Sequence, residues 1–266
     1  MSKKIICLDA GHGGKQPGNV YGARLEKDDT LKLTLLVGAE LAKQGITIVY
    51  TRTTDVDVSI NNRCKIANDA KADYFLSIHR NGATTQATGN EIWVLKTATD
   101  ATAEKAKKIL TACCSVYGSN RGVKYGAPNY NNFGINSGSK MPSALLEVGF
   151  LNNPTDNKNF DTLIQKYAVE IAKALCEIVG IKYTIAPASG PAVSAPKFAV
   201  GDRVKIIGNY ASSANGQVSY SLLKGYYRYI TKIYAGTKNP YRLGSIQGNL
   251  SAIFTTGFAP ETSITK

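Results

Sequence analysis

The sequence predicts an α/β domain, with a mostly parallel twisted sheet and helices on both faces, followed by a small all-β domain. Over the first two thirds of the chain, apolar runs of strand length alternate with amphipathic helical stretches. An uncharged stretch rich in Ala, Pro, Ser and Gly then interrupts this pattern, and short β-type runs separated by Gly and Asn follow it. The length of 266 residues is enough for one well-buried domain and a smaller one.

The N-terminal part alternates strands and helices. An apolar first strand over residues 5–8 ends in a glycine-rich segment, and the loop 15–23 is expected to shape the mouth of a site. Asp28 or Asp29 is expected to cap a helix that runs to about Gln44, so Glu26 would fall just before the cap. The next two predicted elements are a strand over residues 46–50 and a helix over residues 59–70.

The remainder of the first domain continues the alternation. Its predicted elements are strands over 73–78, 91–95 and 143–150 and a helix over 101–117. The tract 129–139, rich in Asn, Gly and Ser, is expected to be a loop that borders the site. Asn152-Asn153-Pro154 is expected to break the chain before a last helix over about 161–179, whose apolar residues recur at helical spacing.

Charge and composition predict one domain over residues 1–182, a linker over 183–196 and a second domain over 197–266. The formal net charge is +13, and residues 183–266 contain nine Lys and Arg against two acidic residues. Such a basic surface favours polyanionic partners, namely anionic cell-wall polymers, acidic lipid surfaces or nucleic acid.

The cysteines and the N-terminus indicate where the protein is made. The five cysteines are odd in number and lack a repeated C-x-x-C spacing, so we expect free and mostly buried thiols. The first strand follows Met1-Ser2-Lys3-Lys4 directly, without an apolar signal region, and no span is long enough to cross a bilayer. We therefore expect synthesis in the cytoplasm without a signal peptide, so that action outside the membrane would require a separate release factor.

Candidate site residues follow the ends of predicted strands. His12 and His79, the only two histidines, each close a similar apolar run, and ligands of open α/β sheets bind at the carboxyl ends of strands. Glu147 is a lone carboxylate in an apolar strand, so it is expected to be paired, metal-bound or catalytic. Together with Glu26, the histidines form a set that suits zinc, and three protein ligands leave a position for water.

Alternative roles remain open for these and other polar residues. Each histidine could instead be a satisfied buried imidazole, and the H-E-x-x-H zinc motif is absent. Asp9 could support a ligand from behind or serve as a structural carboxylate at the strand end. Glu91 is expected at a sheet edge or on the surface, and neither Asp9 nor Glu91 is expected to be catalytic.

The site residues belong to a series of motifs in a familiar order. The series is Leu8-Asp9-Ala10-Gly11-His12-Gly13-Gly14, Leu25-Glu26-Lys27, Thr51-Arg52, Ala67-Asn68, residues 72–81 and Leu146-Glu147-Val148-Gly149-Phe150-Leu151-Asn152-Asn153. Over about residues 3–180 the chain resembles the zinc-dependent N-acetylmuramoyl-L-alanine amidases of the Amidase_3 type.

This resemblance implies a Zn²⁺ enzyme that cuts the amide between the lactyl group of N-acetylmuramic acid and the L-alanine of the peptide stem. It implies that His12, Glu26 and His79 are the zinc ligands and that Glu147 is the catalytic glutamate. Two departures leave these positions intact. Asn152-Asn153 replaces a Ser/Thr-Asn pair, and Arg80 stands where a small residue is frequent, so it could alter substrate preference beside the metal.

The basic second domain has seven tyrosines between Tyr210 and Tyr241. A small β core with amphipathic tyrosines at its rim explains many of them. In its arrangement, the domain resembles the SH3-like cell-wall-binding domains of phage and bacterial lysins. The resemblance implies a bacteriophage endolysin, released with the help of a holin, whose partners are peptidoglycan and the associated anionic wall polymer of a Gram-positive host, with no nucleic acid.

Two other functions are compatible with the sequence. The same metal set could serve a zinc peptidase that acts within the stem peptide. The charge and the small basic β domain could instead belong to a non-catalytic protein that binds the wall or nucleic acid. The oligomeric state is left open by the sequence.

Overall fold

The computed structural model describes residues 3–84, 86–128 and 131–184, and the backbone of five strands beyond them. The chain divides into two compact units, Met1–Thr184 and Ile185–Lys266. Each unit is described by itself.

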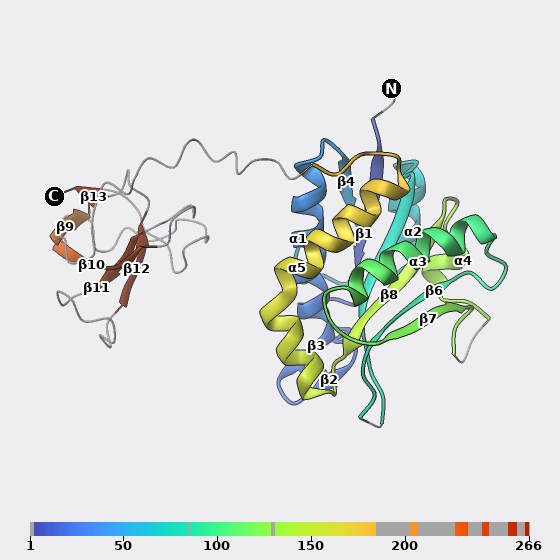
Figure 1. The fold of residues 1–266 in the computed structure, drawn as a ribbon, viewed down its shortest axis with the longest axis horizontal. Helices are drawn as coiled ribbons and strands as arrows, with labels where there is room; N and C mark the ends of the chain where they lie inside the picture. The colour runs from blue at the N-terminus through green and yellow to red at the C-terminus, as the bar shows by residue number, and fades with distance from the viewer. Residues whose placement is uncertain are drawn as a thin grey trace. The chain divides into compact units, whose positions relative to one another are not determined.

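The first unit is built around a six-stranded sheet (Figure 1). The strand order is β4-β1-β5-β8-β6-β7, with bounds β1 Ile5–Ala10, β4 Thr47–Tyr50, β5 Tyr74–Asn81, β6 Asn90–Val94, β7 Asn120–Tyr125 and β8 Ser143–Phe150. Only the β6–β8 pair is antiparallel among these neighbours, so the predicted mostly parallel sheet is confirmed. Strand β7 and the short hairpin of β2 (Val20–Tyr21) and β3 (Arg24–Leu25) were not predicted.

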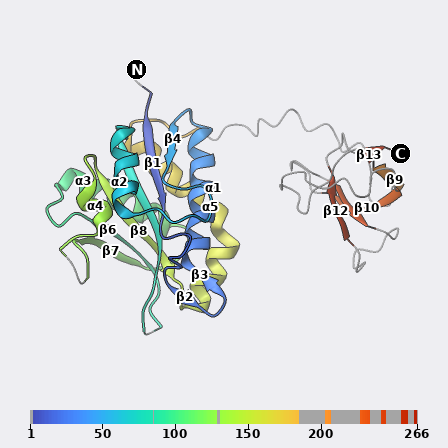
Figure 2. The same ribbon diagram turned by 180° about the vertical axis from the view of Figure 1, so that it is seen from behind.

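Helices cover both faces of this sheet, as predicted (Figures 1 and 2). Helices α1 (Glu26–Ala42), α3 (Asp100–Cys114) and α5 (Pro154–Ile178) pack on one face, and α2 (Ile60–Asp69) and α4 (Gly134–Gly138) pack on the other. Alternate residues of β1, β4 and β5 enter the two apolar clusters because the side chains of a strand point to opposite faces. In β5, for example, Leu76 joins the cluster under α1, α3 and α5, and Phe75 joins the cluster under α2 and α4.

Two helices begin earlier than predicted. Helix α1 starts at Glu26, and its N-cap residue Leu25 has no side chain that could accept a capping bond. The Asp29 carboxylate, one of the two predicted caps, accepts hydrogen bonds from Arg24 Nε at 2.7 Å and Arg80 Nη1 at 2.5 Å instead. Helix α5 starts at Pro154, where a break was predicted. The Asn153 side chain caps it, and proline at the first helical position leaves no backbone donor unpaired.

Arg80 lies on the opposite face of β5 from His79, and its side chain is only 1 % exposed. Its guanidinium binds Asp29, donates from Nη2 to Asn157 Oδ1 at 2.7 Å, and lies 4.3 Å from the ring centroid of Phe160. Arg80 is therefore a core residue that ties α1 and α5 to the sheet. The Arg80 side chain was placed beside the metal in the sequence analysis, and this placement is wrong, because adjacent strand residues point to opposite faces.

The second unit contains a five-stranded antiparallel sheet in the order β12-β11-β10-β9-β13. The strands are β9 Arg203–Ile206, β10 Tyr227–Ile233, β11 Tyr241–Gly244, β12 Thr255–Ala259 and β13 Ile264–Thr265. The predicted linker from residue 185 onward and the tyrosine side chains lie outside the described residues. The SH3-like assignment stays a prediction.

Two further expectations concern cysteines and membranes. All five cysteines are free, and four of them are buried, which confirms the prediction of free thiols. Within the described residues, no helix combines the length and the apolar character that a bilayer crossing requires.

Candidate functional site

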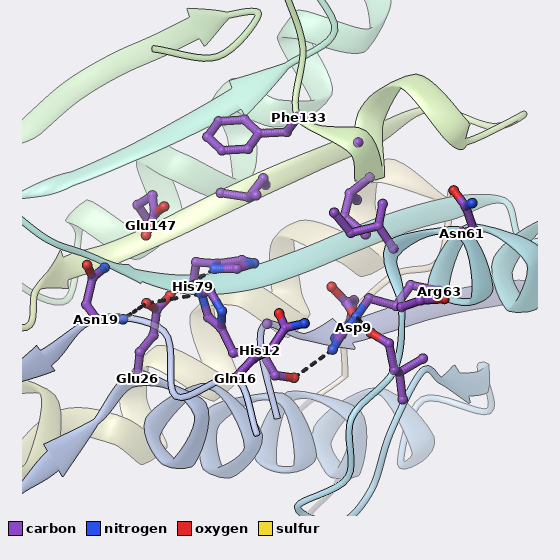
Figure 3. A pocket seen from close by; sticks show the side chains of 17 residues that line it. Asp9, His12, Gln16, Asn19, Glu26, Asn61, Arg63, His79, Phe133 and Glu147 are labelled. Atoms are coloured by element: carbon purple, nitrogen blue, oxygen red, sulfur yellow. Dashed lines mark hydrogen bonds and ion pairs between the residues drawn. The ribbon is translucent and has the colours of Figure 1, made fainter. Parts of the chain in front are cut away.

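The structure brings all four predicted site residues into one pocket of about 530 Å³ (Figure 3). His12 follows β1, His79 lies in β5 and Glu147 lies in β8, and these three strands are neighbours in the sheet. His79 and Glu147 are direct cross-strand partners. Glu26 approaches from the first residue of α1.

His12, Glu26 and His79 converge on one point. His79 Nδ1 lies 2.8 Å from Glu26 Oε1, and His12 Nε2 lies 3.2 Å from Glu26 Oε2. All three potential ligand atoms lie within 4.8 Å of one another. Two imidazole nitrogens and one carboxylate at this spacing match the donor set of a catalytic zinc site, whereas calcium and magnesium prefer oxygen ligands alone.

Glu26 is held as an anion by its surroundings. Its side chain is 1 % exposed, and it accepts backbone N–H bonds from Asn19 at 2.8 Å and Arg80 at 3.0 Å. Burial raises the pKa of Glu26, but the hydrogen bonds to His12 and His79 and the charges of these residues outweigh it, so that the pKa lies below its usual value. The carboxylate is therefore ionised and already aimed at the point where a cation would sit.

Glu147 differs from Glu26 in its hydrogen bonding and in the direction of its pKa shift. Its Oε2 atom is buried and lacks a hydrogen-bond partner among the described residues. Burial, and then the negative charges of Glu26 and Glu91, raise the pKa of Glu147 well above its usual value. A buried carboxyl group with a raised pKa, beside a candidate metal site, is suited to exchange a proton during a reaction.

The pocket walls combine apolar side chains with amides. The apolar lining consists of Val58, Ile60, Phe133, Ile135 and Leu145, and the amides belong to Gln16, Asn19 and Asn61. Both tracts that were predicted to border the site do so, because Gln16 and Asn19 come from the first loop and Phe133 comes from the second. Helix α4, which was not predicted, presents this second tract.

Asp9 and Glu91 are both buried. Asp9 accepts hydrogen bonds from Arg63 Nη1 at 2.7 Å and from the hydroxyls of Thr51 and Ser77 at 2.5 Å, so its carboxylate is fully engaged at the pocket wall.

Glu91 accepts hydrogen bonds from Asn81, Trp93 and Arg121. The expected edge or surface position of Glu91 is wrong, because the unpredicted strand β7 covers the outer side of β6.

Residues that support the site were missed by the sequence reasoning. Asn19 donates its backbone N–H to Glu26, and residue type does not reveal such a donor because every residue except proline has one. Arg52 and Arg63 bind carbonyl groups of the loop around His12. A glycine-rich loop outside regular structure needs donors for its carbonyl groups, so the sequence indicates that such donors exist. No sequence pattern shows which arginines supply them.

Gly11 is required by the packing of His79. A Cβ atom at residue 11 would lie 2.3 Å from His79 Cε1, and the ring cannot move away without leaving Glu26. We expect Gly11→Ala to weaken metal binding at the candidate site by about tenfold or more, the usual range for disturbed ligand support. Titration against a chelating dye measures this. Gly45→Ala is the control, because it strains the backbone where no atom lies within 4 Å, and an equal effect of both variants would contradict the packing argument.

Fold and site together define an α/β protein with a candidate metal centre at the carboxyl ends of its strands. Residues 6–179 match Amidase_3, the family described as N-acetylmuramoyl-L-alanine amidase. The chain belongs to this family, which confirms the resemblance seen in its motifs.

Relatives and solved structures agree with this assignment. The probable cell wall amidase LytH of Staphylococcus aureus is 34 % identical over 183 residues, which cover 65 % of this chain and 56 % of LytH. The match thus spans about half the length of this curated relative. The catalytic domain of the amidase CwlV from Bacillus (Paenibacillus) polymyxa is 31 % identical, with a TM-score of 0.61, and covers 67 % of this chain and 99 % of that one. An amidase from Clostridium difficile 630 is also 31 % identical, with a TM-score of 0.62 and coverage of 67 % and 97 %.

Proposed function

We propose that this protein is a zinc-dependent N-acetylmuramoyl-L-alanine amidase that hydrolyses the amide between the lactyl group of N-acetylmuramic acid and L-alanine in peptidoglycan. The observation that carries the proposal is the convergence of His12, Glu26 and His79 beside the unpartnered carboxylate of Glu147. Family membership and the similarity to the CwlV catalytic domain support it.

The residues of the site have different roles in this reaction. His12, Glu26 and His79 would hold zinc, which when bound supplies Lewis-acid polarisation of the amide carbonyl and lowers the pKa of water. Glu147 takes a proton from the attacking water and delivers it to the leaving nitrogen of L-alanine. In the overall reaction, the water oxygen forms a bond to the carbonyl carbon and the carbon–nitrogen bond breaks. The products are the carboxylic acid of the lactyl group and the free amine of L-alanine.

The cleavage products test this function directly. Walls of Gram-positive bacteria digested with the full chain should release peptides with a free N-terminal L-alanine and leave the glycan strands uncut. A peptidase acting within the stem would instead leave L-alanine on muramic acid, and a non-catalytic binder would release nothing. Mass spectrometry of the digest separates the three outcomes, and loss of activity with a chelator and its return with zinc test the metal requirement.

We further propose that residues 1–182 are the catalytic domain, 183–196 a linker and 197–266 an SH3-like wall-binding domain of a bacteriophage endolysin, whose release is holin-dependent. The division of the chain into two units supports the separation of roles. The high positive charge, the lack of histidine and the antiparallel sheet of the second unit suit the binding of an anionic wall polymer rather than catalysis.

Separating the two units should separate binding from hydrolysis. We expect residues 1–182 to hydrolyse soluble muropeptides at the rate of the full chain but to lyse intact walls more slowly, because tethering raises local substrate concentration without changing the chemical step. A fluorescently tagged 183–266 fragment should sediment with walls, and less so as salt screens charges beyond about 8 Å. No sedimentation with any of a broad panel of walls, combined with undiminished lysis by 1–182, would refute the wall-binding role.

A further inference from the structure

The segment that carries His12 is a loop without regular structure. His12 itself has a left-handed backbone with φ of 61°, which is uncommon for a residue other than glycine and requires support from its surroundings. On either side, Gly11 and Gly13 offer no side chain that could anchor the loop. Apart from the contact of its ring with Glu26, the His12 imidazole is therefore positioned by groups that bind the loop backbone.

Two buried arginines bind the carbonyl groups of this loop. Arg52 donates from Nε to the Ala10 carbonyl at 2.8 Å and from Nη2 to the Gly11 carbonyl at 2.9 Å. Arg63, from α2, donates from Nη1 to the Ala10 carbonyl at 2.7 Å and from Nη2 to the carbonyl of His12 itself at 2.6 Å. Among the described side chains, Arg63 is thus the one that is bound to the backbone of the proposed ligand.

Arg63 is itself fixed in place. Its Nη1 atom is 2.7 Å from Asp9 Oδ1, and Asp9 is held in turn by the hydroxyls of Thr51 and Ser77. The Nε atom donates to the Val58 carbonyl at 2.8 Å, so four of the five guanidinium N–H groups are used within the protein. Although Arg63 lines the pocket, four of its five donors are thereby committed within the protein, two of them to carbonyls of the segment that carries His12.

We propose that Arg63, anchored by Asp9, is a positioning residue that fixes His12 for metal binding. The inference rests on the zinc site of the proposed function and adds the device that orients one of its ligands. A lysine at this position would keep the positive charge beside Asp9, but a single ammonium cannot reproduce the planar fork that reaches two carbonyls and the carboxylate together. Arg63→Lys therefore removes the positioning while keeping the charge.

The test uses the full chain with zinc and cobalt as probes. We expect Arg63→Lys to weaken zinc binding by about 10- to 100-fold, the range found when groups that orient metal ligands are lost. Competition with a chromophoric chelator measures the zinc Kd. The visible absorption of the cobalt-loaded protein should also change at saturating metal, because it reports ligand geometry. A matched control is Ile109→Val, which loosens the core in α3 on the other face of the sheet and should leave both readouts unchanged.

The possible outcomes are distinct. A zinc Kd and a cobalt spectrum of Arg63→Lys equal to those of the unaltered protein would overturn this inference alone, as would an effect confined to KM, which would indicate substrate binding. An unaltered protein that does not bind zinc would overturn the proposed function as well. If Arg63→Lys does not fold, Asp9→Asn decides, because it weakens the anchor of Arg63. It should raise the zinc Kd, and an unchanged value would overturn the proposal.

Discussion

His79→Ala should reduce the zinc content of the purified protein from about one ion per chain to almost none at micromolar metal, and hydrolysis should be lost with it. Removal of His79 leaves only two of the three converging groups, and an alanine cannot replace an imidazole nitrogen. Elemental analysis of the dialysed full chain measures the zinc content, and turbidity of wall suspensions measures the activity.

The control for this prediction is Gln16→Ala. Gln16 also lines the pocket but offers no metal-ligand atom of the histidine, cysteine or carboxylate type, so the variant should retain about one zinc per chain. Full zinc occupancy in His79→Ala would show that the set of His12, Glu26 and His79 is not the metal site.

Glu147→Gln should retain the fold and the zinc but lose hydrolysis by about 100-fold or more, the usual contribution of general acid–base catalysis. An amide of the same shape cannot accept the proton of the attacking water. Measurement of kcat on a soluble muropeptide, together with zinc content, tests both halves of the statement. Glu104→Gln, an exposed change on α3, should behave like the unaltered protein.

The stability of the metal-free Glu147→Gln variant gives an independent check. Folding raises the pKa of Glu147, so the ionised carboxylate opposes folding at pH values above the unfolded pKa. The neutral amide removes this opposition, and its Tm near pH 7 should equal or exceed that of the unaltered metal-free protein. A large drop in Tm would mean that Glu147 has a structural role, and near-normal kcat would place the proton acceptor elsewhere.

Sequence alone was sufficient to predict the strands that carry the site. The apolar runs before His12, before His79 and around Glu147 are local signals, and their glycine-rich or polar ends mark the sheet edge where ligands bind. Because β1, β5 and β8 lie side by side, these ends come together in the structure. The motif order also placed the chain in its family.

The N-terminal boundary of α1 shows where local signals fail. Asp28 and Asp29 are of the residue type that commonly caps helices, yet the helix begins at Glu26, and the Asp29 carboxylate pairs with Arg80, which lies 51 residues away in the sequence. The cost of leaving the Arg80 charge unpaired in the core outweighs the gain of one capping bond.

What the sequence determined by itself was thus the identity of the chemical groups, the strands that bear them and the family. The tertiary structure decided which buried charge meets which partner: Arg80 pairs with α1 behind the site, Glu91 is covered by an unpredicted polar strand, and Arg63 binds the carbonyl of His12. Strand and helix signals arise from neighbours in sequence, whereas a buried charge is paired with whichever partner the packing of distant elements brings within hydrogen-bond reach.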